Sequence, residues 1–403
     1  MDIMTSNTLQ KPKKGKSMLV VISLAIGALF MYADRTVLYP MLEVIAAEFK
    51  LGGTATGFIT STYFLLYVLM QVPAGLLGDA FGLKGVLMGF YLLGGGTLFL
   101  LGLIANNYLF LIVLVGLHGI GMGAYYPASY GINIGTVPKE RRGLASAVIN
   151  SGMSLGTALG LVLSGPIYLR TGNWRWPFLL LAIPTMLVPL LFQRYLPKMP
   201  GVVPDEGDQA PDLKRILRDK ELWALNLSAF CSGYGFWVAL TWGPNFFATE
   251  RALGLTTAGI FTAIPALAAI PAALFAGRLS DKMGRRRLAL ILYPLQAITV
   301  FALAYVTSVP VLVAALILYG IIGRTVSDTV IISWFGDHVA EKSPAALGAA
   351  VGVFNLVGMS SAVIAPLVSG LVKDITGSLS GAFYLGALIV LVGMICTAIT
   401  PEI

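Results

Sequence analysis

The chain has 403 residues, of which 57% are hydrophobic and only 11% are charged, and its mean hydropathy is +0.83. So few polar side chains cannot coat two or three soluble domains, and the composition therefore predicts a polytopic α-helical membrane protein. A membrane β-barrel is excluded because its strands alternate over about ten residues, whereas this chain has continuous apolar runs. The net charge of +8 is no sign of a nucleic-acid partner, because the basic residues lie in short loops between those runs.

An apolar run of about 20 residues is long enough to cross a bilayer as a helix. The first half of the chain contains six such runs, near residues 17–39, 56–79, 85–105, 108–131, 143–168 and 175–196. Lysines precede the first run and no small-residue cleavage site follows it, so we expect this run to stay in the mature protein rather than to be removed as a signal peptide. Residues 1–196 are therefore predicted to form one six-helix bundle.

A polar stretch over residues 197–221, rich in Pro, Gly and acidic residues, is predicted to be a cytoplasmic linker. Six more spans follow near residues 222–247, 255–277, 288–308, 310–335, 345–372 and 381–400, so residues 222–403 form the second predicted bundle. Cys231 and Cys396 lie in apolar runs with no paired spacing and no nearby histidine cluster. Neither a disulfide framework nor a metal site is expected from them.

The basic residues define an orientation. Loops that share a side with the N-terminus carry 20 of the 27 lysines and arginines, and the opposite loops carry five. The remaining two, Arg35 and Arg324, lie inside predicted spans. By the positive-inside rule, both termini are expected in the cytoplasm and the protein in the cytoplasmic (inner) cell membrane.

The two halves of the sequence repeat each other. Three residues recur 202 positions later: Gly75, Asp79 and Gly82 match Gly277, Asp281 and Gly284. Six more recur in the same order 205 positions later: Asn150, Ser164, Gly165, Thr171, Gly172 and Phe178 match Asn355, Ser369, Gly370, Thr376, Gly377 and Phe383. An even number of spans per repeat implies a pseudo-two-fold axis along the membrane normal, so we expect an all-α fold of twelve transmembrane helices in two six-helix bundles, as in transporters.

Two polar turns resemble the loop signature of the major facilitator superfamily, namely Gly75–Lys84 and Gly277–Arg287. The first copy departs from the signature, because Ala80 and Leu83 stand where basic residues are usual. The resemblance implies that the aspartates are stabilised by the N-terminus of a neighbouring helix and that the basic residues hold the cytoplasmic face closed. It therefore predicts a conformational gate made of Asp79, Lys84, Asp281 and Arg285.

Further stretches look like the anion:cation symporter family within that superfamily. They are Tyr32–Pro40, Glu48–Leu51, Gly172–Phe178 and Tyr234–Phe247. The resemblance implies transport of small organic carboxylates or sugar acids, commonly together with protons.

Four charged residues lie well inside predicted spans rather than at their ends: Asp34, Arg35, Arg324 and Asp328. A charge at mid-span costs about 2.5 to 3.5 kcal/mol on insertion scales, so each requires a partner or a water-filled cavity. Arg324 and Asp328 are spaced i, i+4, and two interpretations remain open. They either form an ion pair that stabilises the tenth span, or Arg324 receives a substrate carboxylate while Asp328 restrains it in the empty state.

Asp34 and Arg35 are adjacent, so on a helix their side chains point about 100° apart and their roles must differ. The family resemblance favours Arg35 as an anion contact and Asp34 as a proton carrier, while a local polar contact next to Pro40 is the structural alternative. His118, near the middle of the fourth span, is a third candidate for proton coupling, although a lone histidine in an apolar helix is more often a core residue. The stretch 115–127 lacks the acidic residue that many proton-coupled relatives carry there.

Several aromatic and polar residues could line a substrate cavity. Tyr63, Tyr67 and Gln71 share one face of the second span at a spacing of four. The other candidates are Tyr126, Tyr234, Trp242 and Asn245, for which helix packing is the alternative role. The sequence has no Walker, Ser-His-Asp or HExxH pattern, so we expect neither an enzyme nor a cofactor or metal.

These observations predict a secondary active transporter that moves a small organic anion by alternating access, with proton-coupled symport. Its expected partners are the anion, protons and the lipid bilayer, and it is expected to be a monomer. A proton-coupled drug or metabolite exporter of the same superfamily is the alternative. A non-transporting receptor is a third possibility, but it would need a larger soluble domain than the linker of about 25 residues offers.

Overall fold

The structure is a computed structural model that describes residues 14–199, 217–342 and 347–402. Long helices make up each half of the chain, which confirms the predicted fold class. The first half contains α1 (Lys14–Thr36), α2 (Leu38–Phe49), α3 (Gly53–Phe81), α4 (Leu83–Ile104), α5 (Tyr108–Gly123), α6 (Tyr125–Thr136), α7 (Arg142–Thr171) and α8 (Arg175–Tyr195). The second contains α10 (Lys220–Thr249), α11 (Leu255–Met283), α12 (Arg285–Tyr305), α13 (Val309–Ile322), α14 (Arg324–Lys342), α15 (Leu347–Thr376) and α16 (Ser380–Ile399).

Eleven helical segments in the described ranges are long and apolar enough to cross a membrane. The remaining predicted span is α10, which has 30 residues but carries many buried polar side chains that lower its hydropathy, among them Asn226, Ser228, Ser232, Thr241 and Asn245. Polar side chains are tolerated in a membrane helix that is surrounded by other helices. Most of the predicted linker, residues 200–216, lies outside the described residues.

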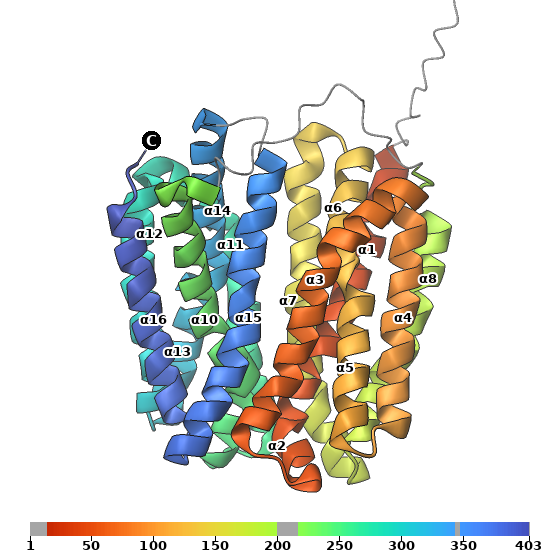
Figure 1. Cartoon of the computed structure of the whole chain (residues 1–403), viewed down its shortest axis with the longest axis vertical. Helices are drawn as coiled ribbons and strands as arrows, with labels where there is room; N and C mark the ends of the chain where they lie inside the picture. Colours follow the sequence, from red (N-terminus) through yellow and green to blue (C-terminus); the bar gives the residue numbers. More distant parts are fainter. Residues whose placement is uncertain (1–13, 200–216, 343–346, 403) are drawn as a thin grey trace, which may run out of the picture.

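The helices of the two halves stand side by side and run along the long axis of the molecule (Figure 1). We call the end where α2 meets α3 the outer end, and the end where the described chain starts and finishes the inner end. The positive-inside rule predicts that the inner end faces the cytoplasm.

Three predicted spans are each divided into two helices. Pro40 and Pro127 explain the first two divisions, because a proline has no N–H with which to bond the carbonyl four residues earlier. Accordingly, α1 ends at Thr36 and α5 ends at Gly123. The third division falls at Gly323, whose extended backbone separates α13 from α14 within the predicted span over 310–335. The two helices together form the segment Val309–Lys342, which is long and apolar enough to cross a membrane.

Helix α1 is held close to α7 by small residues. Gly152, Gly156 and Gly160 follow one another at a spacing of four on α7, and a Cβ atom added to any of them would collide with a backbone carbonyl of α1, at Ala25, Leu29 and Ala33. Such a stripe lets two membrane helices pack backbone to backbone. It fixes the position of α1, which carries Asp34 and Arg35.

The internal repeat is visible in the contacts at the outer end. The Glu48 carboxylate accepts hydrogen bonds from Trp174 Nε1 at 2.7 Å and Arg175 Nη2 at 2.8 Å, just where α8 begins. Glu250, 202 residues later, accepts bonds in the same way from the loop before α16, namely from Ser378 Oγ, Leu379 N and Ser380 Oγ. In each half, a glutamate at the end of the first span therefore anchors the start of the sixth.

The two halves meet along the antiparallel helices α3 and α15. Asp374 accepts hydrogen bonds from the first residues of α3, and further bonds join the helices deeper in the membrane, from Ser61 Oγ to the carbonyl of Val363 at 2.6 Å and from Asn355 Nδ2 to Gln71 Oε1 at 2.6 Å. Lys373 also pairs with Glu43 of α2. Towards the inner end, α3 and α15 diverge (Figure 1).

Candidate functional site

Arg35 lies near the end of α1, where the two halves meet. Its side chain is 4% exposed, and its guanidinium carbon lies 3.9 Å from the ring centroid of Tyr32, 5.2 Å from that of Phe64 and 5.4 Å from that of Trp237. Because Trp237 belongs to α10, rings from both halves surround this cation. Aromatic faces attract a cation, but they do not neutralise its charge.

No acidic side chain neutralises Arg35 within the described part of the chain, and its Nε atom is buried without a hydrogen-bond partner. A buried charge without a counter-ion is unfavourable unless water or an anion reaches it. The arrangement is therefore suited to an anion that enters between the halves.

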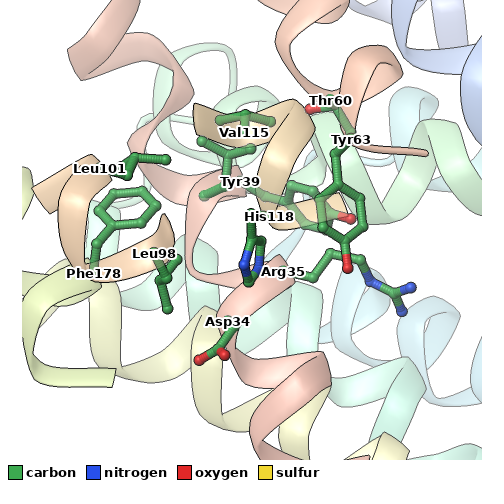
Figure 2. Close-up of a pocket in the computed structure, with 11 residues that line it drawn as sticks. Asp34, Arg35, Tyr39, Thr60, Tyr63, Leu98, Leu101, Val115, His118 and Phe178 are labelled. Atoms are coloured by element: carbon green, nitrogen blue, oxygen red, sulfur yellow. The ribbon is translucent and has the colours of Figure 1, made fainter. Parts of the chain in front are cut away.

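Asp34 points in a different direction from Arg35 (Figure 2). Its side chain is 1% exposed and lies inside the first half, where Thr185 Oγ1 of α8 donates a hydrogen bond of 3.0 Å to Oδ1. Its second oxygen, Oδ2, is buried without a partner. One carboxylate oxygen is thus held in place while the other is available to a proton.

A small cavity connects the two residues with the fourth span. It is lined by Asp34, Arg35, Leu38, Tyr39, Thr60, Tyr63, Leu98, Leu101, Val115, His118 and Phe178. Its free volume is sufficient for about one water molecule. His118 is 3% exposed, and its Nδ1 lies 2.9 Å from the carbonyl oxygen of Gly94 on α4.

The predicted residues of α3 lie beside this site. The rings of Tyr63 and Tyr67 are stacked with their centroids 5.9 Å apart, and Tyr63 also lies 5.4 Å from the His118 ring. Both tyrosines are buried. Gln71, one turn further along, bonds Asn355 of the other half, so this face of α3 borders both the cavity and the interface between the halves.

The remaining aromatic candidates are placed differently. Tyr126 on α6 packs against Tyr130, with 4.5 Å between the ring centroids. Tyr234 on α10 is buried, with its hydroxyl unpartnered. Trp242 donates a 3.0 Å hydrogen bond to the carbonyl of Pro366, and the buried amide of Asn245 has no hydrogen-bond partner. Neither Trp242 nor Asn245 lines the cavity beside Arg35.

In the tenth span, Arg324 is the first residue of α14, directly after the break at Gly323. Its side chain lies outside the described residues. Asp328 is half-buried one turn further along the same helix. The two interpretations of this pair therefore both stay predictions, but Arg324 lies in the first turn of a helix rather than in the middle of one.

The predicted gate residues bond within their own halves. Lys84 Nζ donates to the carbonyls of Gln193 at 2.9 Å and Leu196 at 2.8 Å, at the end of α8. Arg285 forms an ion pair of 2.6 Å with Asp337 of α14. Asp79 and Asp281 are both exposed. The basic residues thus hold helices together inside each bundle in this conformation, and none of the contacts described for them crosses from one half to the other.

Sequence reasoning missed the partner of Lys84 in the second half. Arg286, and not Arg285, lies 202 residues after Lys84, and its Nη2 donates a 2.6 Å hydrogen bond to the carbonyl of Ala398 at the end of α16. The offset of the repeat would have identified it. Glu43, Lys373 and Asp374 were also missed, because their contacts depend on how the two halves are placed against each other.

Comparisons with known proteins agree with this architecture. The family model of the Major Facilitator Superfamily matches residues 24–366 and 227–402. A solved bacterial homolog of the human lysosomal transporter Spinster, in an inward-facing and occupied conformation, superposes with a TM-score of 0.76 at 17% identity, covering 96% of each chain.

Three relatives are similar along most of their length. A probable sulfoacetate transporter of Cupriavidus necator is 27% identical, covering 91% of this chain and 89% of the relative. A probable galactarate/D-glucarate transporter of Escherichia coli (strain K12) is 24% identical, with 98% and 97% covered. A voltage-gated purine nucleotide uniporter of Mus musculus is 26% identical, with 92% and 86% covered. Because the family model matches most of its length, the chain belongs to the major facilitator superfamily and is a membrane transporter, not an enzyme.

Proposed function

We propose that the protein moves a small organic anion, a carboxylate or sugar acid, across the cytoplasmic membrane by alternating access, in symport with protons. The observation that carries the proposal is Arg35, a buried guanidinium that lies between the two halves against aromatic rings and has no acidic partner among the described residues. Both termini lie in the cytoplasm on this proposal, in agreement with the positive-inside rule.

The chemistry of a guanidinium fits such a cargo. Its planar fork of donors binds a carboxylate or a sulfonate through two parallel hydrogen bonds. Tyr63 and Tyr67 lie on the same side and offer hydroxyl groups to a polyhydroxylated acid. The relatives named for sulfoacetate and for galactarate or D-glucarate transport are consistent with an anionic cargo of this size.

Alternating access requires the halves to separate at one end while they close at the other. The bonds from α3 to α15 hold the outer end together, whereas the same helices diverge towards the inner end. This arrangement supports an inward-facing state, in which the anion site communicates with the cytoplasm. The opposite state needs the bonds of Asp374 and Lys373 to break.

Asp34 is the proposed proton carrier, because Oδ2 is buried and unpartnered in the residue next to Arg35. A proton neutralises Asp34, and a bound anion neutralises Arg35. The protein with both bound therefore buries less unpaired charge when it passes through the closed state between its two conformations than the protein with only one bound. One proton with a monovalent anion moves no net charge. For such an anion, the pH gradient drives uptake with about 1.4 kcal/mol per pH unit. A dianion such as galactarate or sulfoacetate moves one net negative charge with one proton, so its uptake is measured with the membrane potential set to zero.

The test uses purified protein in proteoliposomes with labelled galactarate and labelled sulfoacetate as probes. We expect uptake to be driven by an inward proton gradient and to be lost when the carboxylate is replaced by a neutral amide. In the Asp34→Asn variant, uphill uptake should stop while counterflow exchange continues, because Asn keeps the Thr185 bond but carries no titratable proton. Equal binding of the amide, or dye efflux without carboxylate uptake, would favour the exporter instead.

A further inference from the structure

The cavity beside Asp34 belongs entirely to the first half. Its lining residues come from α1, α2, α3, α4, α5 and α8, so the cavity moves as one body with that half. Six polar atoms that have no hydrogen-bond partner belong to residues of this lining: Asp34 Oδ2, Arg35 Nε, Tyr39 OH, Thr60 Oγ1, Tyr63 OH and His118 Nε2. Buried polar groups that surround a space of this size are commonly satisfied by an ordered water with two to four partners.

The neighbours of His118 fix which nitrogen can accept a proton. The carbonyl of Gly94 can only accept, so Nδ1 carries the hydrogen that it donates over 2.9 Å. In the neutral ring, Nε2 is then a bare acceptor that belongs to the cavity. Asp34 is fixed in the same way, because the Thr185 hydroxyl occupies Oδ1 and leaves Oδ2 as the atom that takes the proton.

We propose that one water molecule bridges Asp34 Oδ2 and His118 Nε2 and makes these two residues a single proton-binding site. The proposal rests on the proposed function, which assigns the proton to Asp34, and adds His118 as its second member. In the transfer, the O–H bond of Asp34 breaks and its proton passes to the water, while the water gives another proton to Nε2. The carboxylic acid and neutral imidazole become a carboxylate and an imidazolium, with no change in total charge.

The other residues that line the cavity do not exchange protons near neutral pH, which leaves the transfer between Asp34 and His118. Arg35 on α1 is always charged, and Tyr39 on α2 and Tyr63 on α3 are phenols that stay protonated near neutral pH. Helices α4 and α8 contribute only the apolar side chains of Leu98, Leu101 and Phe178 to the lining. A hard metal cation would require about six oxygen ligands, which so apolar a lining does not offer. Water and a proton are therefore the fitting occupants.

The proton site and the anion contact border the same cavity but extend to different sides of it (Figure 2). The Asp34 carboxylate and the Arg35 guanidinium point to different sides (Figure 2). The guanidinium carbon of Arg35 lies 5.4 Å from the ring centroid of Trp237, which belongs to the second half. The His118 ring extends the site towards Tyr63, which borders the interface.

The test is NMR of the full-length protein in lipid nanodiscs, with all histidines labelled with ¹⁵N and no substrate added. The chain has only two histidines, so the His338→Gln variant leaves one signal set, and His118→Gln assigns the same set by subtraction. We expect His118 to be protonated at Nδ1 when neutral, with Nε2 accepting a hydrogen bond. In Asp34→Asn, the pH midpoint of the His118 signals should move by about one unit or more, because two groups that share a proton titrate together.

A second variant tests the water itself. Val115→Ile adds a methyl group to the cavity, and Val113→Ile is the matched control, since Val113 lies on the same helix but is 49% exposed on its outer surface. Only Val115→Ile should move the Nε2 resonance towards that of a nitrogen with no hydrogen bond. An unchanged midpoint in Asp34→Asn, or identical spectra for the two valine variants, would overturn the shared site. Because no cargo is present, these results are independent of whether galactarate or sulfoacetate is transported.

Discussion

Replacing Asp374 by Asn should weaken the closure of the outer end. The carboxylate accepts hydrogen bonds from Gly53 N at 2.5 Å, Thr54 N at 2.7 Å and Thr54 Oγ1 at 2.6 Å, and it lies at the N-terminus of α3, where a negative charge is stabilised by the helix dipole. Asn offers one acceptor oxygen in place of two and carries no charge. Bonds to charged groups contribute about 1.5 to 3 kcal/mol when shielded, and Asp374 is exposed, so we expect a loss of about 1 to 2 kcal/mol.

That loss corresponds to an increase of about 5- to 30-fold in the ratio of outward-open to outward-closed molecules. The ratio can be measured by pulsed electron paramagnetic resonance between spin labels at Asn106→Cys and Thr307→Cys, which lie in exposed outer loops of different halves. The native cysteines, Cys231 and Cys396, are buried. The expected result is a larger fraction of long distances in Asp374→Asn.

Glu48→Gln is the matched control for this experiment. Glu48 also lies at the outer end and also accepts several hydrogen bonds, but all of its described partners are in its own half. We expect Glu48→Gln to lower stability without changing the distance distribution. If the two variants give the same distribution, the closure of the outer end does not depend on Asp374.

Three other predictions follow from contacts within and between the halves. Gly156→Leu should lower the free energy of unfolding by about 1 to 3 kcal/mol, measured by thermal unfolding, because the added side chain collides with the backbone at Leu29. Arg35→Lys should weaken binding of the carboxylate probe by at least about tenfold in a thermal-shift titration, although the charge is kept, because Lys lacks the planar fork; unchanged affinity would count against Arg35 as the anion contact. Lys84→Ala and Arg286→Ala should each destabilise their own bundle by about 1 kcal/mol and leave the spin-label distances unchanged; a shift in distances would instead support a gate between the halves at these positions.

The sequence was sufficient for the architecture, because hydropathy and an internal repeat are local or periodic signals. Pro40 and Pro127 remove the donors to the carbonyls of Thr36 and Gly123, where two helices end. A proline alone does not predict such an end, because α3 and α7 continue through Pro73 and Pro166. The break at Gly323 carries no comparable signal, because a glycine in a membrane helix is common.

The details of the candidate site were harder to predict, because they depend on packing between distant segments. The bond from His118 to Gly94 is set by how α4 lies against α5, and no spacing in the sequence indicates it. In the sequence, Asp374 resembles a residue of a solvated loop. It accepts hydrogen bonds from the N-terminus of α3 only because α15 lies beside α3. Each of these contacts joins residues whose separation in the chain is unrelated to the helical period.

Adjacent positions on α1, which point about 100° apart, place two neighbouring residues in different surroundings. Asp34 is enclosed by one bundle, while Arg35 reaches across to the other. Trp237 of α10 contacts Arg35 and does not line the cavity beside Asp34. On the proposed function, substitutions near Arg35 can change which anion is bound while the proton site at Asp34 is kept, and substitutions at Asp34 can remove proton dependence while anion binding is kept.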